Sequence, residues 1–284
     1  MKIIECPRDA MQGIHDFIPT QTKIDYLNLL LEVGFDTLDF GSFVSPKAIP
    51  QMQDTAKVIE NLNISTTKTK LLAIVANQKG AEQAVSFEQI DYLGYPLSIS
   101  ETFQLRNTNK TIAESLILTE ELQNLCKKNK KQLVIYISMG FGNPYNDIYN
   151  PEIVEEMTEK LAKMEIKTIA LSDTIGVSSP ENIVPLFKNL IPTFPQIDFG
   201  AHLHSTSSTL IEKIEAAYQA GCRRFDGAIL GFGGCPMAKD ELTGNTATEI
   251  MCRFFERQGE ILPFQTEKME ESIQKATEIF TTYH

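Results

Sequence analysis

Residues 198–228 read DFGAHLHSTSSTLIEKIEAAYQAGCRRFDGA, and this stretch holds the unit that repeats along the chain. A short strand-like segment, Asp198–His202, comes first. A segment with apolar residues at helical spacing, Thr209–Ala220, follows it, and a second short segment, Arg224–Ala228, ends the unit. Short strands that alternate with amphipathic helices are typical of parallel βα structure. The stretch therefore predicts a strand, a helix and a second strand parallel to the first.

The same alternation extends to both sides at intervals of roughly 30 to 35 residues, the length of a βα unit. The predicted strands are Lys2–Glu5, Thr37–Phe40, Leu71–Val75, Gln89–Gly94, Gln132–Met139, Thr168–Leu171, Asp198–His202 and Arg224–Ala228. The predicted helices are Thr22–Val33, Gln51–Asn61, a short and weak Lys79–Val85, Thr111–Asn129, Pro151–Met164, Pro180–Leu190, Thr209–Ala220, Thr248–Gln258 and Thr266–Tyr283.

This pattern favours an α/β fold of the (β/α)8 type, a TIM barrel with extra C-terminal helices. An open doubly wound sheet is the alternative. That fold usually carries a glycine-rich phosphate-binding turn after its first strand, and residues 5–12 contain no glycine. No linker or shift in composition divides the chain, so we expect a single domain over 1–284. The barrel would occupy about 1–230 and a glycine-rich loop with C-terminal helices 231–284.

The composition argues against several classes of partner. The net charge is −11 and no cluster of Lys and Arg stands out, so we expect neither nucleic acid nor an anionic membrane as partner. No apolar run approaches the roughly 20 residues needed to cross a bilayer. No export signal is recognisable ahead of the first strand, so we expect a cytoplasmic location. The five cysteines lack paired spacing and are expected to be reduced.

Barrel enzymes carry their chemistry at the carboxyl ends of the strands. The first strand is followed there by Arg8, Asp9 and Gln12. An Arg–Asp ion pair that closes the barrel mouth is the alternative to a catalytic role. The seventh strand ends with His202 and His204, whose side chains at i and i+2 share one face. Two such imidazoles can bind a divalent ion, although core histidines bonded to backbone carbonyls would give the same pattern.

A glycine-rich segment follows the eighth strand and reads Gly231-Phe232-Gly233-Gly234-Cys235-Pro236. A lone cysteine usually indicates packing. Between glycines and a proline at a barrel mouth, however, the Cys235 thiol can move into a site and exchange a proton. Asn245, a few residues on, offers a neutral oxygen that suits a hard divalent cation.

These segments, in this order, resemble the 3-hydroxy-3-methylglutaryl-CoA lyase family over essentially the whole chain up to about residue 258. The similarity rests on Pro7-Arg8-Asp9 with Gln12, Ser42-Phe43-Val44-Ser45-Pro46-Lys47 with Pro50-Gln51-Met52, Leu171-Ser172-Asp173-Thr174-Ile175-Gly176, His202-Leu203-His204, the Gly-Gly-Cys-Pro segment and Gly244-Asn245. The Gly-Gly-Cys-Pro and Phe-Val-Ser-Pro-Lys segments are specific to the lyase, whereas the Arg-Asp and His-x-His elements are shared with a wider superfamily.

The resemblance implies cleavage of 3-hydroxy-3-methylglutaryl-CoA, an acyl-CoA substrate, into acetoacetate and acetyl-CoA, with Mg²⁺ or Mn²⁺ as cofactor. By matching position, the implied metal ligands are Asp9, His202, His204 and Asn245. The implied catalytic residues are Arg8, which stabilises the enolate, Cys235, the mobile thiol, Asp173 and Asp39. The implied substrate-binding residues are Gln12, Ser42 and Thr174. A homodimer is a further expectation, because the apolar stripe of Thr266–Tyr283 could pack on the barrel or on a second subunit.

The sequence departs from the family pattern near the expected ligands. Asp39 stands where the family has Glu, so a hydrogen bond from Arg8 would need a backbone shift or a water. Asp173 could instead be a cap or turn residue, and Ser205 replaces an Asp that the family often has. These departures leave open a related lyase or aldolase for another 3-hydroxyacyl-CoA or a hydroxy-diacid. A metabolite-binding barrel without catalysis is the alternative from a different class.

Overall fold

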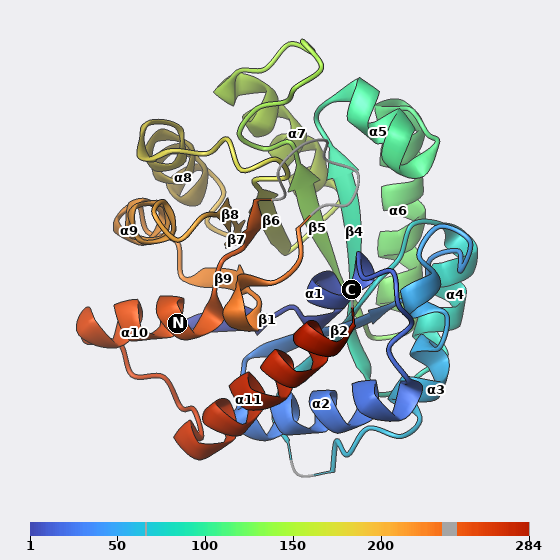
Figure 1. Ribbon diagram of the computed structural model, residues 1–284. Coiled ribbons are helices and arrows are strands. Elements are labelled where there is room, and N and C mark those ends of the chain that lie inside the picture. The colour runs from blue at the N-terminus through green and yellow to red at the C-terminus, as the bar shows by residue number, and fades with distance from the viewer. Residues whose placement is uncertain (66, 235–242, 284) are drawn as a thin grey trace.

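The computed structural model describes residues 1–65, 67–234 and 243–283 and has at its centre a closed barrel of eight parallel strands (Figure 1). Each strand pairs with its neighbours in chain order, and β9 closes the barrel by pairing with both β7 and β1. The barrel strands are β1 Lys2–Glu5, β2 Thr37–Ser42, β3 Lys70–Ile74, β4 Ile90–Ser98, β5 Gln132–Ser138, β6 Thr168–Ser172, β7 Asp198–His202 and β9 Arg224–Gly227. The predicted TIM barrel is therefore confirmed, with all eight strands where the sequence placed them.

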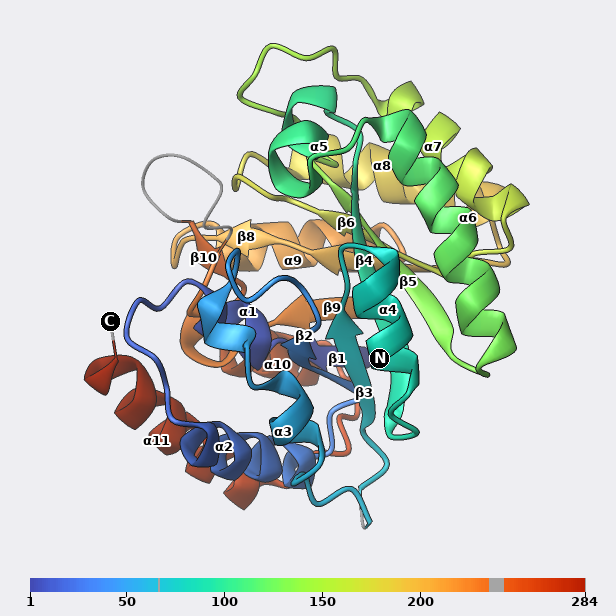
Figure 2. The ribbon, with the colours of Figure 1, turned by 90° about the vertical axis from the view of Figure 1, so that its right-hand side faces the viewer.

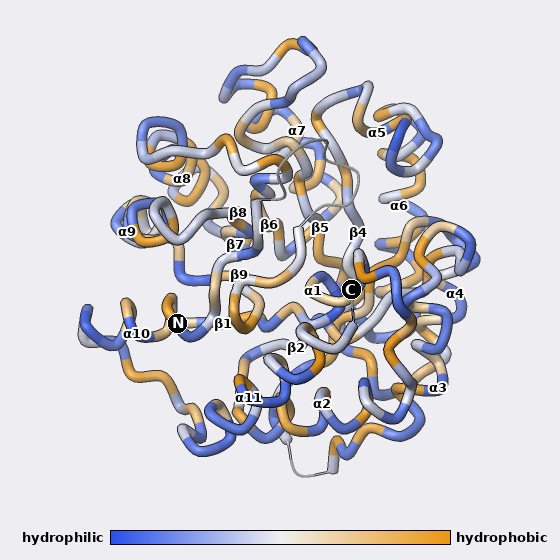
Figure 3. The backbone as a smooth tube through the Cα atoms, viewed as in Figure 1, coloured by the Kyte–Doolittle hydropathy of each residue, from blue (hydrophilic) through white to orange (hydrophobic). Residues whose placement is uncertain are grey.

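The helices surround the barrel on its outside, except for the short α1, which lies within this ring next to β1 and β2 (Figure 1). They are α1 Pro7–Gln12, α2 Thr20–Val33, α3 Thr55–Ile59, α4 Gln78–Val85, α5 Glu101–Thr108, α6 Ile112–Lys128, α7 Pro151–Lys163, α8 Pro180–Thr193, α9 Leu210–Gln219, α10 Thr248–Arg257 and α11 Thr266–Thr282, with short 3-10 turns η1 Pro50–Met52 and η2 Ile229–Gly231. The longer helices carry both hydrophobic and hydrophilic residues along their length (Figure 3). Their apolar faces pack on the strands, which places the main hydrophobic core between the barrel and the helices.

Three helical segments differ from the prediction. The residues after β1 form the helix α1, with Pro7 in its first turn, where the missing N–H costs no hydrogen bond. The single helix expected over Gln51–Asn61 is divided into η1 and α3. Helix α5 was not predicted, and it begins at the side-chain cap of Ser100, which accepts a hydrogen bond from the Phe103 N–H.

The inside of the barrel is small and partly polar. Its apolar cluster consists of Leu72, Tyr92, Val134, Tyr136 and Ala170. The barrel strands also carry buried charged side chains, namely Asp39, Arg224 and Asp226. Because the apolar content is low, the interior can hold charged groups between the two mouths of the barrel.

The C-terminal part of the chain returns to both the mouth and the outside of the barrel. The short strands β8 His204–Ser205 and β10 Gly244–Asn245 pair antiparallel, with Asn245 opposite His204. Helix α11 lies alongside α2, with the Tyr26 and Phe280 rings edge to face (Figures 1 and 2). Of the two expectations for the terminal helix, packing on the barrel is thus observed. Among the described residues, no helix has the length and apolar character to span a membrane.

Candidate active site

Arg8 is fixed by carboxylates on two sides. It lies on α1, directly after β1, and its Nε donates to both oxygens of Asp39 on β2 at 3.2 and 3.1 Å. Its Nη1 donates to Asp9 Oδ1 and Gln12 Oε1, each at 2.9 Å. Arg8 is only 8% exposed, and although burial opposes the charge, Asp39 and Asp9 keep its pKa raised. The guanidinium is therefore a permanent, oriented charge at the carboxyl end of the barrel.

The short Asp39 side chain reaches Arg8 directly. Of the two expected routes, a backbone shift or an intervening water, the water is not needed, because Arg8 donates directly to both Asp39 oxygens. The backbone is irregular here, since the pairing of β2 with β3 shifts register between Asp39 and Gly41. Burial raises the Asp39 pKa to about 6 even though Arg8 opposes the shift. Burial therefore outweighs the attraction of a single guanidinium for this carboxylate.

Three of the predicted metal ligands come together at this mouth. One ligand atom from each of Asp9, His202 and His204 lies within 4.8 Å of the others. The two imidazole rings have centroids 5.4 Å apart. Burial disfavours the charged form of Asp9, but Arg8 and the two histidines lower its pKa overall. An ionised carboxylate beside two imidazoles is a donor set that suits a divalent transition metal or Mg²⁺ with added oxygen ligands.

His204 has a neutral, buried imidazole whose Nε2 is available to bind a metal ion. Burial, with His202 nearby, lowers its pKa to about 4, so the ring is neutral at physiological pH. Its Nε2 is buried and has no hydrogen-bond partner among the described residues. A buried nitrogen acceptor left unsatisfied is costly unless something binds it. The residues present therefore fit a metal ion.

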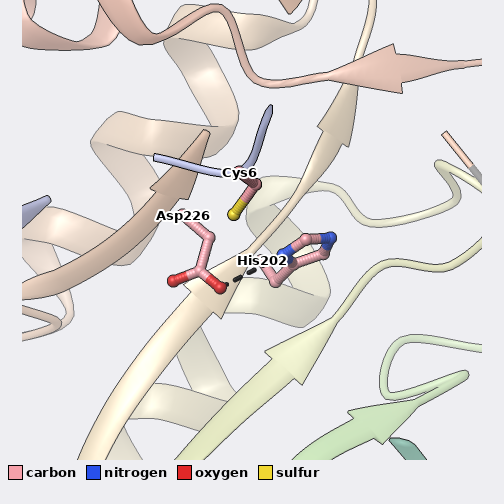
Figure 4. Close-up of side chains that lie close together, drawn as sticks. All are labelled: Cys6, His202 and Asp226. Atoms are coloured by element: carbon pink, nitrogen blue, oxygen red, sulfur yellow. Dashed lines mark hydrogen bonds and ion pairs between the residues drawn. The ribbon is translucent and has the colours of Figure 1, made fainter. Parts of the chain in front are cut away.

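His202 is oriented by a residue that the sequence did not single out. Its Nδ1 lies 3.2 Å from Oδ2 of Asp226 on β9, as the dashed line in Figure 4 shows. Burial opposes protonation, but the bond to Asp226 raises the His202 pKa. A carboxylate on one imidazole nitrogen fixes the ring and leaves the other nitrogen for a metal.

A second possible cluster shares His202. Cys6, His202 and Asp226 also place ligand atoms within 4.8 Å of one another (Figure 4). Burial raises the Cys6 pKa well above its usual value, and its thiol points to the Ile4 carbonyl oxygen at 3.8 Å. In this cluster Asp226 already engages His202 Nδ1, whereas His204 Nε2 in the other cluster has no partner among the described residues. The cluster that contains Asp9 is therefore the better candidate for a metal site.

Asn245 and the glycine segment lie against this cluster. The Asn245 Nδ2 donates to Asp9 Oδ2 at 2.7 Å and to the Phe232 carbonyl oxygen at 2.8 Å, so the amide nitrogen, and not the oxygen expected as a ligand, faces Asp9. Gly233 has φ +93°, and a Cβ there would lie 2.6 Å from the Asp9 carbonyl oxygen. Glycine is thus required both for its backbone conformation and for the close approach. Cys235, two residues further, lies outside the described residues.

The remaining predicted residues have structural contacts. Asp173 is fully buried, accepts from the Ser178 N–H at 3.0 Å and pairs with Lys213 Nζ at 2.9 Å. Thr174 Oγ1 accepts from the Met139 N–H at 2.8 Å, which secures the turn after β5. Lys213 also donates to carbonyl oxygens of the segments that carry Asp173 and His204. Asp173 is therefore placed to hold those two segments together.

Ser42 and Gln12 are the other two residues expected to bind substrate. Ser42 is buried at the end of β2, and its Oγ accepts from the Val44 N–H at 3.3 Å. Gln12 contacts both Arg8 and Asp9, donating to the latter at 2.7 Å. Their proposed contacts with substrate remain predictions.

Sequence reasoning missed Asp226 and Lys213. Asp226 lies two residues after Arg224 on the last barrel strand, so charged residues at strand spacing were a usable signal for a polar interior. Lys213 lies on α9, where no sequence signal marks it, since lysine is seldom fully buried. It is 2% exposed because Asp173 and two carbonyl oxygens receive its ammonium group.

Comparison with known proteins finds relatives that are acyl-CoA lyases. The family model described as HMGL-like matches residues 2–279. A hydroxymethylglutaryl-CoA lyase of Bacillus subtilis is 33% identical over 251 residues, which are 88% of this chain and 83% of the relative. An (R)-citramalyl-CoA lyase of Chloroflexus aurantiacus is 31% identical over 258 residues, covering 88% of this chain and 81% of that protein.

Solved structures agree with this result over nearly the whole chain. The HMG-CoA lyase of Bacillus subtilis has a TM-score of 0.90 and 31% identity, covering 96% of this chain and 91% of that one. An HMG-CoA lyase of Acinetobacter baumannii, solved with coenzyme A and 3-methylmalate, has a TM-score of 0.90 and 29% identity, covering 98% and 90%. With the same barrel and a family match along almost its full length, the chain belongs to the HMGL-like family of acyl-CoA lyases.

Proposed function

We propose that this chain cleaves 3-hydroxy-3-methylglutaryl-CoA into acetoacetate and acetyl-CoA, with Mg²⁺ or Mn²⁺ bound by Asp9, His202, His204 and Asn245. The observation that supports it best is the contact, at the carboxyl end of the barrel, between the cluster of possible metal ligands and the Arg8 guanidinium. Asp9 belongs to the cluster of possible ligands and also accepts a hydrogen bond from Arg8. A fixed cation next to a divalent-ion site suits a reaction in which negative charge develops on a substrate oxygen.

When bound, the divalent cation supplies Lewis-acid activation of the tertiary hydroxyl of the substrate. As that hydroxyl gives its proton to a base, the bond between C2 and C3 breaks, C3 becomes the ketone of acetoacetate, and the electron pair forms the enolate of acetyl-CoA. Of the five guanidinium N–H groups, four point to Asp39, Asp9 and Gln12, and one on Nη2 has no partner among the described residues. We assign that group to the enolate oxygen.

A proton must then reach the carbanion carbon of the enolate. We propose that the Cys235 thiol supplies it. The support comes from the described ends of the surrounding segment, because Gly233 lies against Asp9 and Asn245, and Gly244 pairs with Ser205 next to His204. Both ends are therefore held beside the proposed metal ligands. Asp173, paired with Lys213, is proposed to act by holding the His204 segment in place.

A second candidate substrate follows from the relatives. The (R)-citramalyl-CoA lyase is about as similar to this chain as the HMG-CoA lyases are. Citramalyl-CoA carries its carboxylate directly on the carbinol carbon, one carbon closer than in 3-hydroxy-3-methylglutaryl-CoA. The same residues would cleave it to an oxo acid and acetyl-CoA, so the distance from the metal ligands to the group that receives the carboxylate would decide between the two.

The test is release of product by the purified full chain with Mg²⁺ or Mn²⁺, and with a chelator as control. Acetoacetate released from 3-hydroxy-3-methylglutaryl-CoA in a metal-dependent way supports the first proposal. Preferential cleavage of citramalyl-CoA would replace it with the second. Binding of both thioesters without cleavage, in a metal-loaded chain, would instead support a metabolite-binding barrel.

A further inference from the structure

A cavity of about 420 Å³ lies at the opposite mouth of the barrel, away from the proposed catalytic residues. Its lining includes the first residues of five barrel strands, so it lies at their amino ends: Lys2, Gln132, Thr168, Asp198 and Arg224. Lys167, Gln196 and Tyr92 also line it. Barrel enzymes carry their chemistry at the carboxyl ends, so this polar cavity is separate from the proposed reaction.

Arg224 is an unpaired cation in this cavity. It is 2% exposed, yet its Nε and Nη2 are buried and have no hydrogen-bond partner among the described residues. Its side chain crosses Gly200 on the neighbouring strand, where a Cβ would lie 3.0 Å from Arg224 Cδ. A buried guanidinium without hydrogen bonds is strongly unfavourable. Because Gly200 has no side chain, the Arg224 side chain can pass over it in this conformation.

The protein itself compensates this charge only in part. Asp226, two residues along the same strand, attracts Arg224, but it forms no salt bridge with it: its Oδ2 is bonded to His202 and its Oδ1 has no partner among the described residues. Asp198 pairs with Lys2 at 2.9 Å. Lys167, the third cation of the lining, has no salt bridge to any residue that the structure describes. The cavity therefore carries three cations and one carboxylate, in a chain whose net charge is −11.

We propose that this amino-end cavity binds a small oxyanion, with Arg224 and Lys167 as its charged partners. A guanidinium presents a planar pair of N–H groups that matches the oxygens of a phosphate or a carboxylate. The ligand would approach the guanidinium from the cavity that Arg224 lines and would add negative charge that Asp198 alone does not provide there. The polar lining and the volume suit a phosphate-sized or dicarboxylate-sized anion rather than an apolar metabolite.

The test is calorimetric titration of the full chain with inorganic phosphate, and separately with malonate, at constant ionic strength. The variant Arg224→Met removes the cation while keeping an unbranched apolar chain, and Lys167→Met removes the exposed one. Arg223→Met is the matched control, because Arg223 is an exposed neighbour with the same charge that does not line the cavity. It also reports any general effect of phosphate on stability.

We expect saturable binding of at least one anion by the parent, weakened roughly tenfold or more by Arg224→Met, as loss of a charged hydrogen bond predicts. Lys167→Met should weaken it severalfold and Arg223→Met should leave it unchanged. The tighter of the two anions identifies the ligand chemistry. The proposal is wrong if neither anion binds, or if Arg224→Met binds like the parent. Should Arg224→Met not fold, unchanged binding by Lys167→Met overturns it.

Discussion

Glu5 is a buried carboxyl group whose ionisation should govern the pH dependence of stability. It ends β1, and its oxygens accept hydrogen bonds from the Ile229 N–H at 2.9 Å and the Thr248 hydroxyl at 2.6 Å. Burial raises its pKa from 4.5 to about 8, although these two bonds oppose the shift. The protonated form is therefore favoured in the folded state.

The sign and size of the effect follow from linkage. Because the folded pKa is the higher one, the stabilisation is fully present below pH 4.5 and is lost as the pH rises toward 8. A difference of this size corresponds to about 5 kcal/mol of unfolding free energy, taken as an upper limit because the structure can relax around the charge. The variant Glu5→Gln keeps an oxygen for Ile229 and offers an N–H to Thr248, without the ionisation.

The assay is urea unfolding of both proteins at a series of pH values from 5 to 8.5. We expect the free energy of unfolding of the parent to fall relative to that of Glu5→Gln across this range, by up to about 4 kcal/mol. Glu256→Gln, an exposed change on the nearby helix α10, is the control and should run parallel to the parent. Parallel curves for Glu5→Gln and the parent would refute the assignment.

Four further predictions concern the proposed reaction. His204→Ala should weaken Mn²⁺ binding and activity together, and a variant that binds Mn²⁺ as tightly as the parent would remove this residue from the ligand set. Arg8→Gln should lower kcat by roughly 100-fold or more, as loss of a preorganised donor does. A change confined to KM would contradict that role. Asp226→Asn should reduce metal affinity roughly tenfold or more by loosening the His202 ring, measured by Mn²⁺ titration, with an unchanged affinity as the contrary result. Brief alkylation with peptide mapping should label Cys235 first, because the other four cysteines are buried and burial raises the pKa of each. Equal labelling of a buried thiol would contradict this.

The fold was predictable because its signal is repeated. Each strand contributes a short apolar run and each long helix a stripe of apolar residues. A misplaced boundary in one βα unit therefore does not change the predicted number of units. Short helices carry no such repeat. Helix α1 spans only Pro7–Gln12, and α5 depends on the cap at Ser100, so both were missed or read as loop. Their position is set by contacts with the barrel rather than by their own pattern.

The site was predictable as far as strand ends determine it. Asp9, His202 and His204 follow strands of one parallel barrel, so they had to meet at the same mouth. The partners that orient them were not predictable in the same way. Asp226 reaches His202 only because β9 pairs with β7 in a register that sets the two residues opposite each other. That register depends on closure of the whole barrel, which no local segment encodes.

Asp226 connects the two mouths of the barrel. On one side it accepts from His202, and through that ring it bears on the cluster with Asp9. On the other side it is the carboxylate that most attracts Arg224. Its Oδ1 is buried and has no hydrogen-bond partner among the described residues, so the carboxylate attracts Arg224 without bonding to it. Arg224 therefore keeps unmet hydrogen bonds beside the far cavity, where the proposed anion would add the negative charge that Asp226 supplies only at a distance.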